Sequence, residues 1–288
     1  MKNLVLATDL TGQSDRAFER AIKLTAMMKT KLHILHVCPS YSYADQKSRF
    51  SSLKQDAEDT VKNYLSCYPE AEDIRYSITI IEGGEVFLEI IKHAEKVKSD
   101  LIVMGMHGKS RFRDMFIGTT IERVIRKGIT PVLMVKNKAV GDYKTILIGT
   151  DFLPGSRRTF QIALELAHDG FFHLFHCYEI PDTTIGDTIR HWHGDMIKKS
   201  EDEQLEKFVK DHQKFLKKFG VSPERFRYWT ADGATYSCLT REAAALKPDL
   251  IAIGAHGSAG GFTIDKLGGT AQSILTNPPC DVLVAKSI

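Results

Sequence analysis

Glycines placed between an apolar strand and a helix are the residues of this chain best suited to chemistry. Gly105 and Gly108 follow the apolar run Leu101–Met104. After nine intervening residues, Gly118 precedes a helix-like run from Thr119 to Arg126. Glycine lets the backbone approach a ligand closely, and the free N–H groups of a helix's first turn point toward it. The pattern therefore predicts a site that holds phosphate groups.

The second half of the chain repeats the motifs of the first half in the same order. A repeat of this length indicates the duplication of a whole domain and not a short solenoid unit. The matching pairs are Leu4–Asp9 with Ile146–Asp151, Leu32–His36 with Phe172–His176, Asp100–Gly108 with Asp249–Gly257, and Pro131–Lys136 with Asp281–Lys286.

The length of 288 residues fits two domains of ordinary size. We expect the first domain to span residues 1–139 and the second 140–288, with a short polar linker near Asn137–Asp142. The second copy carries extra residues in its middle, which we place within Pro181–Glu203.

Composition narrows the classes of function. The net charge of +3 gives no electrostatic case for nucleic acid as a partner. No apolar run is long enough to span a membrane, and the first strand begins too early for a signal peptide. The five cysteines include no Cys-x-x-Cys pair, so we expect a reduced, cytoplasmic protein.

Short apolar runs alternate with longer amphipathic stretches in each half, which predicts an α/β fold. Continuous apolar strands indicate a parallel sheet covered on both faces, and the strand–helix alternation implies a doubly wound sheet. Ligands bind such sheets beyond the carboxyl ends of the strands, so Asp9 and Gly105 line one crevice if their strands are neighbours. In the first half we expect strands at Asn3–Thr8, Lys31–Val37, Tyr76–Ile81, Leu101–Gly105 and Val132–Val135, and helices at Ser14–Met28, Ser48–Ser66, Val86–Lys98 and Thr119–Arg126.

These motifs make the chain resemble the universal stress protein family in its tandem-domain form. Residues 105–119 match the family's pattern Gly-x2-Gly-x9-Gly-(Ser/Thr), and the resemblance covers nearly the whole chain. It implies two tandem doubly wound domains of the adenine nucleotide alpha-hydrolase-like type, each with a five-stranded parallel sheet in the order 3-2-1-4-5. It also implies an ATP-binding protein that acts in stress response as a nucleotide-dependent sensor or regulator.

The resemblance carries a set of binding positions onto the first half. Family members that bind ATP place the aspartate after the first strand near the ribose and a residue ending the second strand near the adenine. A divalent ion such as Mg²⁺ would be held mainly through the nucleotide phosphates. The positions that match are Ala7, Thr8, Asp9, Val37, Met104, Gly105, His107, Gly108, Gly118, Thr119 and Thr120.

Each of these residues also has a purely structural explanation. Asp9 is a common residue in turns and helix caps, and Thr119 suits a helix N-cap. Gly105 and Gly108 suit a tight turn. The basic residues Lys109, Arg111 and Arg113 can neutralise phosphates or simply face solvent, and His107 has no identifiable carboxylate partner, so no catalytic residue is assigned.

The second half departs from the glycine pattern. Ten residues, and not nine, separate Gly257 from Gly268. If Gly268 aligns with Gly118, Gly269 replaces the hydroxyl residue at Thr119; if Thr270 supplies the hydroxyl group, the loop is longer still. We expect weaker ATP binding there, or none. The histidines of this half suggest a metal site, but His173 and His176 should point to opposite faces of a strand, whereas His191 and His193 share a face only if their segment is extended.

Three classes of function stay open at this point. The first is an ATP-binding stress-response protein, and the second is a non-catalytic interaction protein with vestigial nucleotide sites and an unidentified protein partner. A true enzyme is disfavoured because no nucleophile–base pair stands out, which leaves at most slow ATP hydrolysis. We also expect Pro131–Lys136 and Asp281–Lys286 to be edge strands through which the two halves form an intrachain pseudo-dimer.

Overall fold

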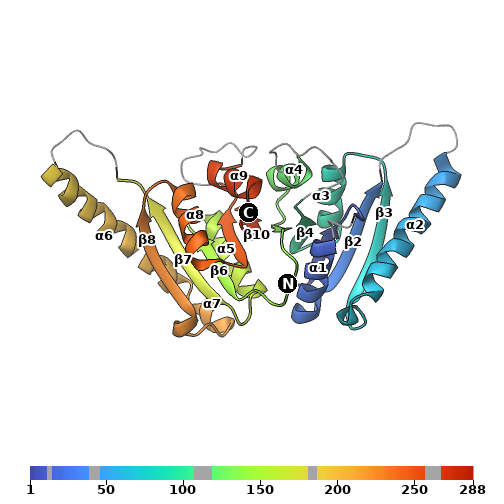
Figure 1. The fold of residues 1–288 in the computed structure, drawn as a ribbon, viewed down its shortest axis with the longest axis horizontal. Helices are drawn as coiled ribbons and strands as arrows, with labels where there is room; N and C mark the ends of the chain where they lie inside the picture. Colours follow the sequence, from blue (N-terminus) through green and yellow to red (C-terminus); the bar gives the residue numbers. More distant parts are fainter. Residues whose placement is uncertain (12–14, 39–45, 107–118, 181–186, 257–266, 288) are drawn as a thin grey trace. The chain divides into compact units, whose positions relative to one another are not determined.

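The chain forms two compact units (Figure 1), of which the first contains residues 1–141 and 275–282 and the second residues 142–274 and 283–288. This computed structural model describes residues 1–11, 15–38, 46–106, 119–180, 187–256 and 267–287. Within these ranges no helix is long and apolar enough to cross a membrane.

The first unit contains a parallel sheet with the strand order β3-β2-β1-β4-β5. This order confirms the doubly wound α/β fold expected from the sequence. Its elements are β1 (Asn3–Ala7), α1 (Asp15–Met28), β2 (Lys31–Cys38), α2 (Gln46–Ser66), β3 (Arg75–Glu82), α3 (Val86–Lys96), β4 (Leu101–Gly105), α4 (Thr119–Lys127) and β5 (Val132–Val135).

Helices cover both faces of this sheet, as the alternating sides of β2 show. His33 contacts the ring of His93 on α3, whereas Cys38, which points to the opposite face, packs with Ala57 on α2. Helices α1 and α2 share their face, because the rings of Phe18 and Tyr64 lie 5.4 Å apart. The strands are therefore buried on both sides, which explains their continuous apolar runs.

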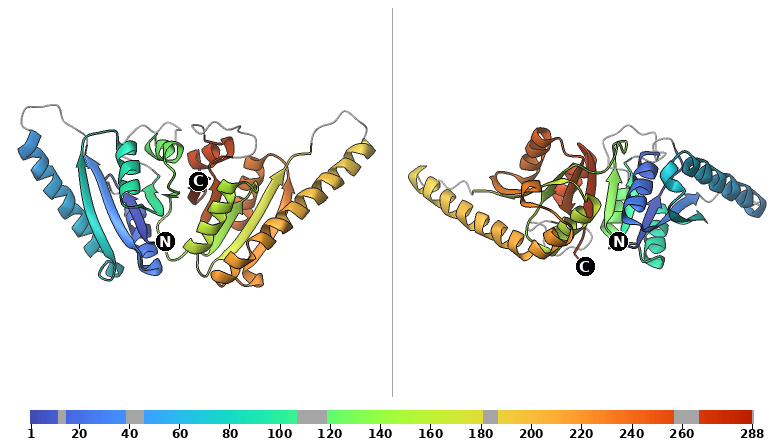
Figure 2. Two further views of the ribbon diagram at one scale, coloured as in Figure 1. Left: turned by 180° about the vertical axis from the view of Figure 1, so that it is seen from behind. Right: turned by 90° about the horizontal axis from the view of Figure 1, so that it is seen from below.

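The second unit repeats the same plan with the strand order β10-β9-β6-β7-β8. Figure 2 shows α6 running alongside β8 in this unit, as α2 runs alongside β3 in the first. The connection between β7 and β8 is longer than its counterpart and contains the additional helix α7. The elements are β6 (Thr145–Gly149), α5 (Pro154–Leu166), β7 (Phe171–Tyr178), α6 (Asp187–Asp211), α7 (Gln213–Lys218), β8 (Phe226–Asp232), α8 (Thr235–Leu246), β9 (Leu250–Gly254), α9 (Gly269–Thr276) and β10 (Asp281–Ala285).

In both units an aspartate side chain accepts hydrogen bonds from the backbone at the start of the central strand, β1 or β6. Asp100 Oδ2 accepts hydrogen bonds from the N–H groups of Lys2 and Asn3 at 2.5 and 3.0 Å. Asp249 Oδ2 accepts the equivalent bonds from Lys144 and Thr145, both at 2.9 Å. The repeat in the sequence is thus a repeat of side-chain roles as well as of strands.

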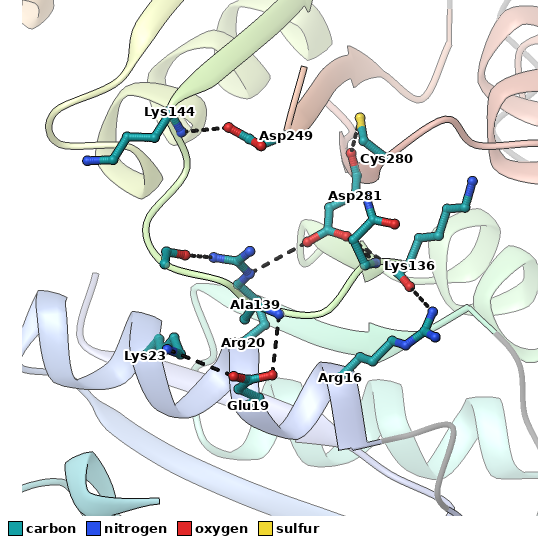
Figure 3. Close-up of polar contacts among 12 residues, drawn as sticks. Arg16, Glu19, Arg20, Lys23, Lys136, Ala139, Lys144, Asp249, Cys280 and Asp281 are labelled. Carbon is teal, nitrogen blue, oxygen red and sulfur yellow. Dashed lines mark hydrogen bonds and ion pairs between the residues drawn. The ribbon is translucent and has the colours of Figure 1, made fainter. Parts of the chain in front are cut away.

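A third aspartate, Asp281, begins β10 (Figure 3). The first two residues of that strand fall in the segment 275–282 of the first unit, and the rest of the strand belongs to the second unit. Asp281 is fully buried, and its Oδ1 accepts hydrogen bonds from the N–H groups of Lys136 and Asn137 at 2.9 and 3.0 Å. Its Oδ2 lies 3.6 Å from Nε of the buried Arg20. Removing this carboxylate alone should be costly, because Arg20 would then lose its buried counter-charge.

The buried histidines of the first unit predict sensitivity to acid. Burial, followed by the charge of Lys31, lowers the pKa of His33, and burial, followed by Lys96, lowers the pKa of His93. The unfolded chain then binds more protons than the folded chain below about pH 6.5. Stability that is present at neutral pH should therefore be lost as the pH falls through that value toward the folded pKa.

Urea unfolding monitored at several pH values checks this prediction. The free energy of unfolding should decrease between neutral pH and about pH 5. The variant His93→Phe keeps a ring on α3 and should make that decrease shallower. An equally steep decrease in the variant would show that His93 does not contribute.

Candidate functional site

Parallel pairing brings the carboxyl ends of β1 and β4 together. Strand β1 lies between β2 and β4, with Ala7 opposite Leu35 on one side and Met104 on the other. Asp9 therefore follows β1, and Gly105 ends the neighbouring strand β4, at the same edge of the sheet. This is the point where the strand order reverses, as the sequence analysis required for a ligand site.

The turn after β1 is held by its own side chains. Thr8 Oγ1 accepts a hydrogen bond from the Leu10 N–H at 3.1 Å. Asp9 Oδ1 accepts bonds from the N–H and the hydroxyl group of Thr11 at 3.1 and 2.7 Å. Leu10 consequently has a φ of +56°, a region that a leucine adopts at a cost of about 1–3 kcal/mol.

The second carboxylate oxygen of Asp9, Oδ2, is the atom of this turn that points to a ligand. Asp9 Oδ2 is buried and has no hydrogen-bond partner among the described residues. A buried acceptor without a partner costs about 1–3 kcal/mol, and more when the group is charged. The geometry therefore leaves an acceptor available for a donor that is not part of the described chain, such as a hydroxyl group of a ligand.

A buried histidine braces the same turn from the neighbouring strand. His36 Nδ1 donates a hydrogen bond to the Thr8 carbonyl oxygen at 2.8 Å. The Thr8 N–H in turn donates to the Leu35 carbonyl oxygen at 3.0 Å. His36 thereby fixes the backbone from which Asp9 projects. His36 was not among the residues predicted for the site, although its recurrence as His176 was a visible signal.

The second unit contains the same turn with nearly the same bonds. The Phe152 N–H donates to Thr150 Oγ1 at 3.0 Å, and the Leu153 N–H donates to Asp151 Oδ1 at 3.1 Å. His176 Nδ1 donates to the Thr150 carbonyl oxygen at 2.7 Å, and Phe152 has a φ of +65°. Two independent copies of one strained turn indicate that the conformation is specified by the sequence.

The side chains around the second turn differ from those around the first. Phe152 replaces Leu10, and its ring lies 4.3 Å from the ring of His176, whose Nε2 is 3.4 Å from Glu201 Oε2. Leu153 replaces Thr11, so the hydroxyl group that bonds to Asp9 has no counterpart beside Asp151. The second turn thus contacts α6 through Phe152, whose ring lies 5.9 Å from that of Phe208, and through His176 beside Glu201, and it lacks a hydroxyl group beside its aspartate.

The structure gathers part of the predicted set at one edge. Ala7, Thr8, Asp9, Met104 and Gly105 lie on adjacent chain ends, and Val37 lies on β2, on the other side of β1. Thr119 and Thr120 begin helix α4. The remaining predicted residues, His107, Gly108 and Gly118, lie outside the described residues, so the phosphate-binding part of the motif stays a prediction.

The glycine that ends β9 has a packing role of its own. A Cβ atom on Gly254 would lie 3.2 Å from the backbone nitrogen of Ser156 and 3.5 Å from the carbonyl carbon of Gly155. Strand β9 and the start of α5 therefore approach too closely for a larger residue. In the second unit this glycine is explained by packing alone, without a ligand.

The described histidines of the second unit do not converge on a metal. His173 contacts the Trp229 ring, whereas His176 faces Thr150 and Glu201, so the two point to opposite faces as expected. His191 and His193 lie in α6, so the extended segment that would align them is absent. Within the described ranges no three histidine, cysteine, aspartate or glutamate side chains are placed to hold a metal ion.

A model of the universal stress protein family matches the chain twice, over residues 1–136 and 142–286. The chain belongs to the universal stress protein family. The two matches coincide with the two copies of the β1–α1 turn and its bracing histidine. The family resemblance drawn from the glycine motif is confirmed.

Individual relatives match parts of the chain. Universal stress protein MJ0577 of Methanocaldococcus jannaschii is 36% identical over 89 residues, which are 31% of this chain and 53% of that protein. Universal stress protein MJ0531 of the same organism is 28% identical over 141 residues, covering 47% of this chain and 82% of that protein. The match thus spans about half the length of the first relative.

A solved structure shares the fold over the full tandem. The crystal structure of a universal stress protein from Archaeoglobus fulgidus covers 99% of this chain and 98% of its own, with a TM-score of 0.68 and 18% identity. At this identity the likeness shows the fold alone. It agrees with two doubly wound universal stress protein repeats in one chain.

Proposed function

We propose that the first unit binds an adenine nucleotide, ATP with Mg²⁺, at the carboxyl ends of β1 and β4. The protein would act in stress response as a nucleotide-dependent sensor or regulator. Mg²⁺ would be held mainly by the phosphates, since it commonly uses substrate oxygens and few protein ligands. The family's glycine–threonine pattern at residues 105–119 supports this assignment.

One observation carries the proposal above the others. Asp9 Oδ2 is a buried acceptor without a partner in the described chain, at the position where the family resemblance expects a ribose. A ribose hydroxyl group would donate to this oxygen, while Asp9 Oδ1 stays bonded to Thr11. The brace from His36 keeps the carboxylate in place before the ligand arrives, which reduces the entropy lost on binding.

The second unit is proposed to bind the nucleotide more weakly or not at all. Its glycine loop is longer by one residue, and Gly269 stands where the first unit has Thr119. The ring of Phe152 and the pair of His176 with Glu201 also change the surroundings of the turn. The two units would then be functionally unequal despite their common fold.

A second candidate function is a non-catalytic interaction protein whose nucleotide sites are vestigial. The close packing at Gly254 favours it for the second unit, because that glycine needs no ligand to explain it. Cytoplasmic location, an unidentified protein partner and the pseudo-twofold pairing of the two halves stay predictions under either function.

Equilibrium titration of ATP and Mg²⁺ into nucleotide-stripped full-length protein tests the proposal. Asp9→Ala should weaken binding by about 10- to 100-fold, since a hydrogen bond to a charged group contributes about 1.5–3 kcal/mol. Asp9→Asn keeps an oxygen for Thr11 and should also lose affinity, because one acceptor of the carboxylate becomes a donor.

Asp151→Asn is the matched control, because Asp151 occupies the same turn in the second unit. It should leave the titration nearly unchanged. Asp9 variants that fold normally and bind ATP as the unmodified protein does would overturn the site. An Asp151 variant that loses the binding instead would move the site to the second unit.

A further inference from the structure

The second unit contains a pair of thiols that the nucleotide proposal does not use. Cys177 lies near the carboxyl end of β7 and is partly exposed, whereas Cys238 lies on α8 and is buried. The two side chains are neighbours, because Cys177 lies opposite Ala231 and Cys238 Sγ lies 3.5 Å from the carbonyl oxygen of the next residue, Asp232. Both are free thiols.

The surroundings of Cys238 hold its sulfur beside the strand ends. Its thiol donates to the Asp232 carbonyl oxygen at 3.5 Å, at the end of β8, and Arg241 Nη2 lies 3.7 Å from Cys238 Sγ. Gly233 adopts a φ of +126°, and a Cβ atom there would lie 3.3 Å from the same sulfur. Cys177 lies opposite Ala231, one residue before Asp232, so the register of β7 and β8 brings its thiol to the same place.

The internal repeat shows that this pair is specific to the second copy. Val37 stands in the first copy where Cys177 stands in the second, directly after the bracing histidine. Glu89 corresponds to Cys238, since each lies against the glycine before its helix, Gly84 or Gly233. Glu89 accepts a bond from Lys92 Nζ at 2.7 Å, as Cys238 does from Arg241. At these two positions the first copy thus carries no thiol, whereas the second carries two neighbouring thiols.

We propose that Cys177 and Cys238 are a modification site that a peroxide oxidises to an intramolecular disulfide. The Cys177 thiolate attacks hydrogen peroxide, the O–O bond breaks, hydroxide leaves, and Cys177 becomes a sulfenic acid. The Cys238 thiolate then attacks the sulfenic sulfur, the S–S bond forms, and the S–O bond breaks. The displaced hydroxide takes up the thiol proton, so two thiols and one peroxide give one disulfide and two waters.

The order of the two steps follows from exposure, because the oxidant reaches the partly exposed Cys177 before the buried Cys238. Burial, followed by the neighbouring Cys238, raises the pKa of the Cys177 thiol well above its usual range. The thiolate is the reactive form, so oxidation should be slow at neutral pH and should accelerate as the pH rises.

Peroxide treatment of the reduced full-length chain, followed by peptide mapping without reductant, tests the proposal. A cross-linked peptide pair containing Cys177 and Cys238 should form, and its rate should increase between about pH 7 and pH 9. Cys238→Ser removes the resolving thiol, so a dimedone adduct should accumulate on Cys177. Cys177→Ser should prevent both the cross-link and the adduct.

The exposed Cys67 provides a reference thiol in the same molecule. Cys67→Ser should leave the cross-link unchanged. Oxidation of Cys67 alone, with Cys177 and Cys238 still reduced, would overturn the proposal. So would a Cys238→Ser protein that retains the circular dichroism of the parent chain and gives no adduct on Cys177. Because these readouts need no nucleotide, their failure is distinguishable from failure of the ATP site.

Discussion

Replacing Asp281 by alanine should lower the free energy of unfolding of the first unit by about 3–5 kcal/mol, since it breaks a buried ion pair by removing one partner. The carboxylate is fully buried, accepts the N–H groups of Lys136 and Asn137, and lies beside Arg20. Alanine would remove the shared acceptor of the two N–H groups and the carboxylate beside Arg20, whose Nη1 would still donate to the Gly141 carbonyl oxygen. Urea unfolding followed by circular dichroism gives the magnitude.

Asp249→Ala is the matched control, because Asp249 also accepts two successive backbone N–H groups but does so at an exposed position (Figure 3). Water can replace its bonds, so the loss should be only about 1–2 kcal/mol. Asp281→Asn keeps one oxygen for the two N–H groups and should fall between the two. Equal losses at Asp281 and Asp249 would show that burial of the carboxylate contributes nothing.

Phe160→Ala should destabilise the second unit by about 3–5 kcal/mol, as large-to-small changes at buried aromatic residues do. Phe160 is fully buried on α5, and its ring makes edge contacts with Phe208, His212 and Phe226 at 5.6, 5.2 and 6.1 Å. One substitution therefore leaves a cavity against α6 and β8 and removes several aromatic contacts. Hydrogen exchange of the full chain should show lost protection in peptides of α5, α6 and β8.

Phe18→Ala is the corresponding change in the first unit, where Phe18 packs on Tyr64. Each substitution should reduce protection mainly in its own unit, because each unit has its own buried core. A loss below about 1 kcal/mol for Phe160→Ala would mean that the site relaxes to fill the cavity. That result would contradict the core described for the second unit.

Much of the fold followed from the sequence because parallel strands buried on both faces leave a strong apolar signal. Strands β4 and β5 begin and end where expected, and β1, β2 and β3 differ by only one or two residues at their ends. The helices were less sharply bounded: α3 ends at Lys96 and not at Lys98, where the chain turns through a positive φ. Such ends are set by local backbone geometry, which side-chain periodicity does not report.

The additional helix α7 and the extended α6 were not predicted. The sequence repeat located the extra residues between β7 and β8, but α7 has no counterpart in the first copy, and α6 is longer than its counterpart α2. For this reason the sequence left open an extended segment at His191 and His193, whereas both residues lie on helix α6.

Only part of the candidate site could be predicted. Asp9 was found by its place after a strand, and β1 and β4 are neighbours as required. The brace from His36 was missed because its partner is the Thr8 carbonyl oxygen, and a backbone acceptor leaves no sequence signature. The positive φ of Leu10 was missed for a related reason: the strain is imposed by Thr8 and Asp9 and is not signalled by a glycine.

We propose that Asp9 presents to a bound adenine nucleotide the carboxylate oxygen that has no partner among the described residues. A crystal structure of the full chain grown with ATP and Mg²⁺ tests it most directly. We predict a nucleotide at the carboxyl ends of β1 and β4, with a ribose hydroxyl within hydrogen-bonding distance of Asp9 Oδ2 and phosphates toward the start of α4. A nucleotide bound elsewhere, or none beside Asp9 at saturating ATP, would contradict the account.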